Sequence, residues 1–252
     1  MGTTFHRTIL AALALALTAL VHAQTISDTA PASKPTPESA FETVVIDGLK
    51  DPHRLSVARL QKAVSAVDAN RNLAPSAQLR FMAIDAEPTA APLALKVEND
   101  GLRSAIAVDA AGLFDLALIG SEEAQKTELV SNRRKGSLRI RPYVASAGYE
   151  GDRRRLGDLR LECAAYWSIR RDDLSFLQKA IVTAVGGACT SANVSSSYPV
   201  PRKLTNAKLI HGERSIDVTL KEGGMGFWPP LYDASWPDDA VVTLTFASAA
   251  SK

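Results

Sequence analysis

Two stretches of the chain place hydrophobic residues at the spacing of an amphipathic helix. We expect the first helix over residues 52–67, because Asp51-Pro52 is typical of a helix start and an apolar stripe follows it. That stripe consists of Val57, Leu60, Val64 and Val67. We expect the second helix to follow a cap at Asp172-Asp173 and to end at Gly186-Gly187. Its stripe consists of Leu174, Leu177, Ile181 and Val185.

Elsewhere hydrophobic and polar residues alternate, which is the pattern of half-buried strands. The segments that show it are 41–46, 79–81, 93–97, 137–144, 159–167, 194–198 and 241–246. Two further pairs of segments predict hairpins, 104–108 with 113–118 and 207–210 with 215–220. Their turns are expected at 109–112 and 211–214. The glycines and prolines of 223–230 predict an irregular loop.

These elements predict an α+β protein that is predominantly β. We expect an antiparallel β-sandwich-like N-terminal half and a sheet-plus-helix C-terminal half. A polar, arginine-rich stretch from Gly151 to Arg160 is either a domain boundary or a long hairpin loop. As a boundary it gives a β-rich domain over 41–150 and an α+β domain over 151–252. Residues 24–40 are rich in Pro, Ser and Thr and predict a flexible linker.

The first 23 residues have the three parts of a secretory signal peptide. Arg7 supplies the positive charge, Ile9 to Val21 is an apolar run of 13 residues, and Val21-His22-Ala23 offers a cleavage site. A membrane-spanning helix needs about 20 apolar residues, so this run is too short to be an anchor. We therefore expect a periplasmic or secreted protein with no transmembrane segment once residues 1–23 are removed.

The chain after residue 23 contains two cysteines, Cys163 and Cys189. An even pair in an oxidising compartment favours a disulfide. A redox or metal role is the alternative, but there is no C-x-x-C motif. We expect a structural disulfide in the C-terminal domain.

The pattern Asp109-x-x-Gly112-x-Phe114-x-Leu116 resembles the strand–turn–strand signature of carboxypeptidase-regulatory-like, or transthyretin-like, β-sandwich domains. That resemblance implies a seven-stranded extracytoplasmic module that stabilises or binds. It covers about 15 residues, and the helix expected over 52–67 departs from the family's pattern.

Basic residues are concentrated between Arg133 and Arg160, although the whole chain carries a net charge of only +2. Planar guanidinium groups suit carboxylate or phosphate partners. We expect an anionic-partner face for an envelope glycan, a lipid head group or an acidic protein, and no nucleic acid. The residues of this arginine face are Arg139, Arg141, Arg153, Arg154 and Arg155. The alternative is a solvated strand face whose arginines pair with nearby acids.

Three aromatic residues, Trp228, Tyr232 and Trp236, lie close together in a Pro-rich segment. Such rings can stack on a sugar or on a partner's proline. The alternative is that they cover one end of the sandwich.

No catalytic constellation assembles from the sequence. Residues 144–148 lack the first Gly of a G-x-S-x-G nucleophile elbow. His53 and His211, the histidines beyond residue 23, do not have zinc-ligand spacing, and we expect no cofactor. The sequence thus predicts an exported, non-catalytic binding or structural module of the cell envelope. The alternative is an extracytoplasmic hydrolase that uses carboxylates or His211.

Overall fold

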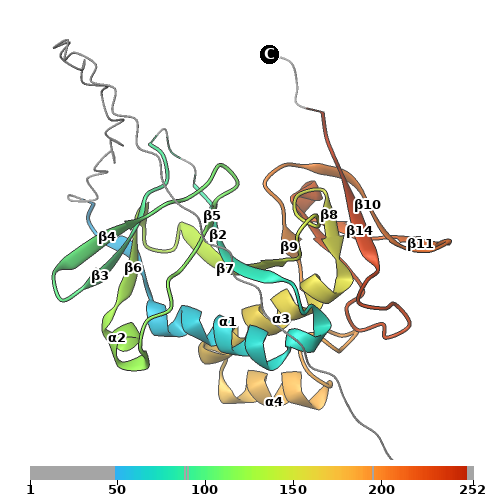
Figure 1. Cartoon of the computed structure of the whole chain (residues 1–252), viewed down its shortest axis with the longest axis horizontal. Coiled ribbons are helices and arrows are strands. Elements are labelled where there is room, and N and C mark those ends of the chain that lie inside the picture. The colour runs from blue at the N-terminus through green and yellow to red at the C-terminus, as the bar shows by residue number, and fades with distance from the viewer. Residues whose placement is uncertain (1–48, 88, 90, 195, 249–252) are drawn as a thin grey trace, which may run out of the picture. The chain divides into compact units, whose positions relative to one another are not determined.

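The computed structural model describes residues 49–87, 89, 91–194 and 196–248 (Figure 1). The described residues form a mixed α and β structure in which strands outnumber helices and every strand pairing is antiparallel, which confirms the predicted fold class. All of them belong to one unit, Val44–Lys252. The predicted signal peptide, linker and strand over 41–46 lie outside the described residues.

Two sheets and two helices enclose the first core. One sheet has the strand order β1-β6-β3-β4 and the other β5-β2-β7. The first sheet contains β1 Pro52–Ser56, β3 Leu95–Asn99, β4 Leu102–Ile106 and β6 Glu128–Arg134. The second contains β2 Gln78–Asp85, β5 Leu113–Phe114 and β7 Leu138–Ala145. Both contribute to one buried cluster, with Leu129 from the first sheet and Phe81 and Val144 from the second.

The first predicted helix begins later than expected. Residues 52–56 form β1, which pairs with β6, and helix α1 covers Val57–Ala69. The Asp51-Pro52 signal was therefore misread: Asp51 has a positive φ of 60° and leads into a strand. From residue 57 onward the expected stripe is confirmed at Val57, Leu60 and Val67, which are buried, whereas Val64 is half-buried. The short helices η1 Arg71–Leu73 and α2 Ser121–Lys126 complete this region.

The predicted hairpin over 104–118 is wrong in its pairing but right in its turn. Strand β4 pairs with β3, whereas β5 pairs with β2. The turn exists because the Asp109 carboxylate accepts hydrogen bonds from the backbone of Ala111 and Leu113. Gly112 has a φ of +78°, and its ideal Cβ position would be 2.7 Å from the Ala83 carbonyl oxygen, so only glycine fits there.

Two further sheets and a second core make up the C-terminal part. Their strand orders are β11-β10-β14-β8 and β12-β13-β9. The strands are β8 Arg153–Arg155, β9 Tyr198–Pro199, β10 Leu204–His211, β11 Arg214–Asp217, β12 Thr219–Lys221, β13 Gly226–Trp228 and β14 Val241–Phe246. The predicted hairpin around 211–214 and the last strand are confirmed. The loop expected at 223–230 instead begins with the 3-10 helix η3 Glu222–Gly224 and contains β13.

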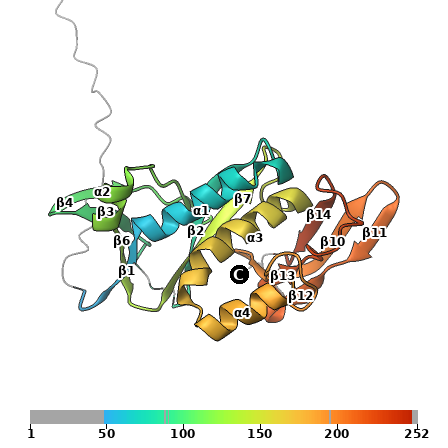
Figure 2. The same ribbon diagram turned by 90° about the horizontal axis from the view of Figure 1, so that it is seen from below.

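Helix α3, Leu156–Arg170, separates the two cores. The side chains of Leu161 and Ala165 belong to the first core, and those of Leu159 and Cys163 to the second. The prediction of a strand over 159–167 is wrong. Because α3 is buried on two opposite faces, its sequence lacks the single apolar stripe by which a surface helix is recognised. Figures 1 and 2 show α3 running beside α1.

After the 3-10 helix η2, Arg171–Asp173, helix α4 covers Phe176–Ala184 and confirms the second predicted helix. Its cap is Ser175 rather than Asp172-Asp173: Ser175 and Gln178 form a reciprocal capping box. The disulfide Cys163–Cys189 is confirmed, with a Cα–Cα separation of 5.8 Å. It ties α3, and not the expected strand, to the segment after α4.

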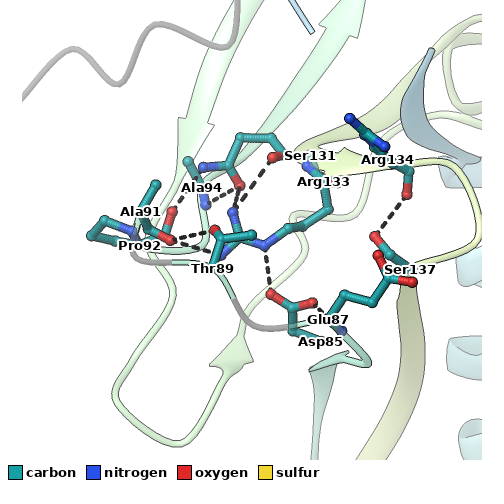
Figure 3. A network of polar contacts seen from close by, with 11 residues as sticks. Asp85, Glu87, Thr89, Ala91, Pro92, Ala94, Ser131, Arg133, Arg134 and Ser137 are labelled. Atoms are coloured by element: carbon teal, nitrogen blue, oxygen red, sulfur yellow. Dashed lines mark hydrogen bonds and ion pairs between the residues drawn. The ribbon is translucent and has the colours of Figure 1, made fainter. Parts of the chain in front are cut away.

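Arg133 shows how one residue of the basic stretch is used inside the fold (Figure 3). Its buried guanidinium binds Asp85, the Ala91 carbonyl oxygen and the Asn132 side chain. Asn132 in turn holds the backbone of Pro92 and Ala94. The network pins the connection between β2 and β3 to β6, so Arg133 has a structural role here.

Candidate functional site

The outer edge of β7 is closed by side chains of α3. The Val144 N–H donates to Glu162 Oε2 at 3.0 Å, and the Ser146 N–H donates to Asp158 Oδ2 at 2.8 Å. Because Asp158 and Glu162 are four residues apart, they project from the same side of the helix. Their carboxylates thus replace the neighbouring strand that an edge strand lacks.

Arg154, the middle residue of β8, also takes part in this contact between β7 and α3, which we call the α3 junction. Its Nη2 donates to Glu162 Oε2 at 2.7 Å and to the Val144 carbonyl oxygen at 2.9 Å. Its guanidinium lies 4.3 Å from the centre of the Tyr143 ring. Burial alone would lower the pKa of Arg154, but the nearby Glu162 carboxylate raises it above its ordinary value, so the Arg154 guanidinium keeps its charge.

A cavity of about 690 Å³ opens beside this buried pair. Its apolar walls come from both halves of the chain, with Met82, Leu113 and Tyr143 on one side and Leu244 and Phe246 on the other. Small-molecule cavities are lined mainly by apolar side chains, and their usual volume is about 300–1,000 Å³. The size and the lining of this cavity match those of a small-molecule site.

Four charged side chains line the same cavity: Glu150, Asp152, Arg154 and Arg202. Arg154 is buried, whereas the other three are exposed. The Arg202 guanidinium lies 4.4 Å from the centre of the Phe246 ring, and Glu150 Oε2 accepts a hydrogen bond from the Gly148 N–H. The cavity thus offers both signs of charge together with a largely apolar wall.

A second cavity, of about 510 Å³, lies along β4. Residues 102–107 line one side, and Asp115, Leu116, Ala117 and Ile119 line another. Most of its lining is apolar, with Val57 and Val97 among its residues. Helices α1 and α2 also contribute lining residues, Val57 and Glu123, and this cavity shares no lining residue with the first one.

The five arginines of the predicted face are placed in different surroundings. Arg154 is buried against Glu162, and Arg141 lies 4.1 Å over the Tyr166 ring. Arg153 and Arg155 lie 5.0 and 5.7 Å from the Tyr149 ring, so these two are close together. Arg139 is exposed on β7. The structure brings Arg153 and Arg155 together but directs Arg154 inward, and binding of an anionic partner by this set stays a prediction.

The three aromatic residues of the predicted loop also differ in exposure. Trp236 is buried in the second core with the Arg214 guanidinium 3.8 Å from its ring centre. Trp228 is part of β13 and half-buried, and Tyr232 is 46% exposed. Arg160 anchors this segment by donating to the carbonyl oxygens of Leu231, Asp233 and Trp236. Of the three rings, that of Tyr232 is therefore the most accessible to a ligand.

His211, the residue of the hydrolase alternative, lies at the end of β10 on an exposed hairpin. Its Nε2 is 3.5 Å from Asp239 Oδ1, and it lines neither of the two cavities described above. Among the described residues, no group of three or more His, Cys, Asp or Glu side chains could hold a metal ion. Nucleophile, base and cavity do not converge at His211, and the hydrolase reading stays a prediction.

Sequence reasoning missed the Arg154–Glu162 pair and the cavity next to it. Arg154 belongs to the predicted arginine face, and Glu162 is one of the nearby acids with which its arginines were expected to pair in the alternative interpretation. A carboxylate pair at helical spacing, Asp158 with Glu162, was the available signal, but it is informative only if the segment is known to be a helix.

Comparison of the chain with family models, with curated proteins and with solved structures gives no match. In the described part of the chain, no helix has the length and apolar character needed to cross a membrane.

Proposed function

We propose that this protein is an exported, non-catalytic binding module that takes a small zwitterionic ligand with an apolar body into the cavity at the α3 junction. The observation that carries the proposal is the 690 Å³ cavity, whose apolar walls surround two acidic and two arginine side chains. Export is supported by the signal-like residues 1–23 and by the disulfide. Mass spectrometry of the native protein would contradict export if the chain retained Met1.

The charges of the cavity select the ligand class. A simple anion would meet Glu150 and Asp152 as well as the arginines, and the charge of Arg154 is already balanced by Glu162. A ligand that carries both an ammonium and a carboxylate can satisfy both signs at once. An apolar amino acid or dipeptide is such a ligand, because its side chains fill the apolar wall.

The direct test is calorimetric titration of the protein with the dipeptide leucyl-phenylalanine. Two derivatives each remove one charge, the N-acetyl form the ammonium and the C-terminal amide the carboxylate. We expect each derivative to bind at least about tenfold more weakly, because a charged side chain of the cavity wall then loses its partner on the ligand. If the N-acetyl form binds as tightly as the free dipeptide, the ligand class is a simple anion and not a zwitterion. If none of the three forms binds, the proposal is overturned.

A matched pair of variants locates the site. Arg202→Ala removes an exposed guanidinium from the cavity wall, whereas Arg139→Ala removes an exposed guanidinium from β7, outside that wall. We expect Arg202→Ala to weaken dipeptide binding about tenfold and Arg139→Ala to leave it unchanged. The opposite result would assign binding to the arginine face rather than to the cavity.

A further inference from the structure

Among the residues that the structure describes, nothing gives the edge strand β4 the usual protection against pairing. It ends the β1-β6-β3-β4 sheet and lies at the outer side of the molecule in both views (Figure 1, Figure 2). Natural edge strands are normally short, charged, interrupted by proline or covered. β4 has five residues, Leu-Arg-Ser-Ala-Ile, and its single charged side chain, Arg103, is paired with Glu98 at 2.9 Å.

The other edge strands of the four described sheets are protected in these ways. β1 and β9 contain Pro52 and Pro199, β8 consists of three arginines, and β7 is covered by the α3 carboxylates. β11 begins and ends with a charged residue, and β12 and β5 are only three and two residues long. β4 therefore differs from all of them.

The side chains of β4 make its surface self-complementary. Leu102, Ser104 and Ile106 share the face of Val97 and Asn99, and all five line the 510 Å³ cavity. Leu102 is 77% exposed at the rim of that cavity. An exposed leucine thus stands beside an open apolar groove, so two copies of the chain present a projection and a recess to each other.

We propose that β4 pairs antiparallel with β4 of a second copy, about a two-fold axis that passes between the two Ser104 residues. In this register Leu102 lies opposite Ile106 of the second copy, and Arg103 lies opposite Ala105. Apolar residues then face each other, and no two like charges are directly opposite. The pairing joins two four-stranded sheets into one continuous sheet and is isologous, as a two-fold dimer requires. It does not depend on the ligand proposed above.

A cysteine at the two-fold axis tests the geometry. The described cysteines are both in the native disulfide, so Ser104→Cys provides the only free thiol among them. Directly opposed residues of an antiparallel pair have Cα atoms about 4.5–5.5 Å apart, within the range that a disulfide bridges. We expect Ser104→Cys to form a covalent dimer under mild oxidation, and Ser215→Cys, on the exposed edge strand β11, to form no covalent dimer.

Sedimentation of the purified chain at about 1 to 200 µM measures the association itself. We expect a concentration-dependent dimer whose dissociation constant rises about tenfold or more in Ser104→Arg, because two guanidinium groups then oppose each other at the axis. Ser215→Arg should leave it unchanged, and circular dichroism shows that both variants are folded. A chain that is monomeric at every concentration, or a dimer that Ser104→Arg leaves intact, overturns the proposal; in either case an added extended peptide becomes the alternative occupant of the β4 edge.

Discussion

Helices α3 and α4 are neighbours in the chain, and a disulfide connects their region, yet they are stabilised in opposite ways. α3 is buried on two faces and carries three core leucines, Leu156, Leu159 and Leu161, with no measurable exposure. α4 has no buried residue, and Phe176, Leu177 and Ile181 are 87%, 68% and 55% exposed. The hydrophobic pattern of a helix therefore shows which residues could be buried and leaves open whether anything covers them.

The difference extends to charged residues. Glu162 on α3 is 5% exposed and binds Arg154, whereas Asp172, just before α4, is 45% exposed and binds Lys62 of α1. The side-chain hydrogen bond from Lys62 lowers the pKa of Asp172. Water screens this exposed pair strongly and the buried pair weakly.

The largest effect is expected where the buried pair is broken. Glu162→Ala leaves the Arg154 charge without its partner and should lower the free energy of unfolding by about 3–5 kcal/mol. Asp172→Ala removes an exposed partner and should cost less than about 1 kcal/mol. Urea denaturation of both variants measures the two values, and similar losses would contradict the contrast between the junction and the surface.

An intermediate effect is expected at alkaline pH. The Tyr198 hydroxyl donates to the Leu159 carbonyl oxygen of α3, and burial raises the pKa of Tyr198 well above its ordinary value. The unfolded chain releases this proton above about pH 10 while the folded chain keeps it, so stability is full below that pH and falls by about 1.4 kcal/mol per pH unit above it.

Unfolding measured between about pH 9 and 11.5 tests this dependence. Tyr198→Phe is the control, because it keeps the buried ring and removes the ionisable hydroxyl. The variant should lose the alkaline decline that Tyr198 causes. An unchanged slope in Tyr198→Phe would show that another group is responsible.

The smallest effect is expected on α4. Phe176→Ser should change the free energy of unfolding by no more than about 0.5 kcal/mol, because the side chain is already in water. Leu161→Ala, in the first core, should cost about 2–5 kcal/mol. Thermal unfolding compares the two, and a loss above about 1 kcal/mol in Phe176→Ser would mean that α4 is covered in the folded protein.

The elements that could be predicted from the sequence are those with a one-sided pattern and a local signal. The hairpin at 211–214 and the strand over 241–246 alternate clearly, and the helix that became α4 ends at a glycine pair. β1 could not be recognised, because residues 52–56 become a strand only by pairing with β6, more than 70 positions away. The interpretation of α3 as a strand has a related cause, since its two buried faces belong to two different cores.

The candidate site was less predictable than the fold. Arg153, Arg154 and Arg155 are adjacent and chemically identical, yet only the middle one is buried. Alternation along a strand sets this difference, but β8 is recognisable only through its pairing with β14. The cavity needs walls from β2, β7 and β14, so no local stretch of sequence contains it.

The disulfide that joins Cys163 to Cys189 encloses the end of α3, the whole of α4 and the turns between them in one covalent ring. A peptidase that severs the backbone once inside this ring, for instance at the exposed α4, leaves the two pieces connected through sulfur. The nicked molecule keeps the mass of the intact chain plus one water until a reductant is added. Cleavage of the backbone at α4 therefore does not detach the part of the chain that carries the second core.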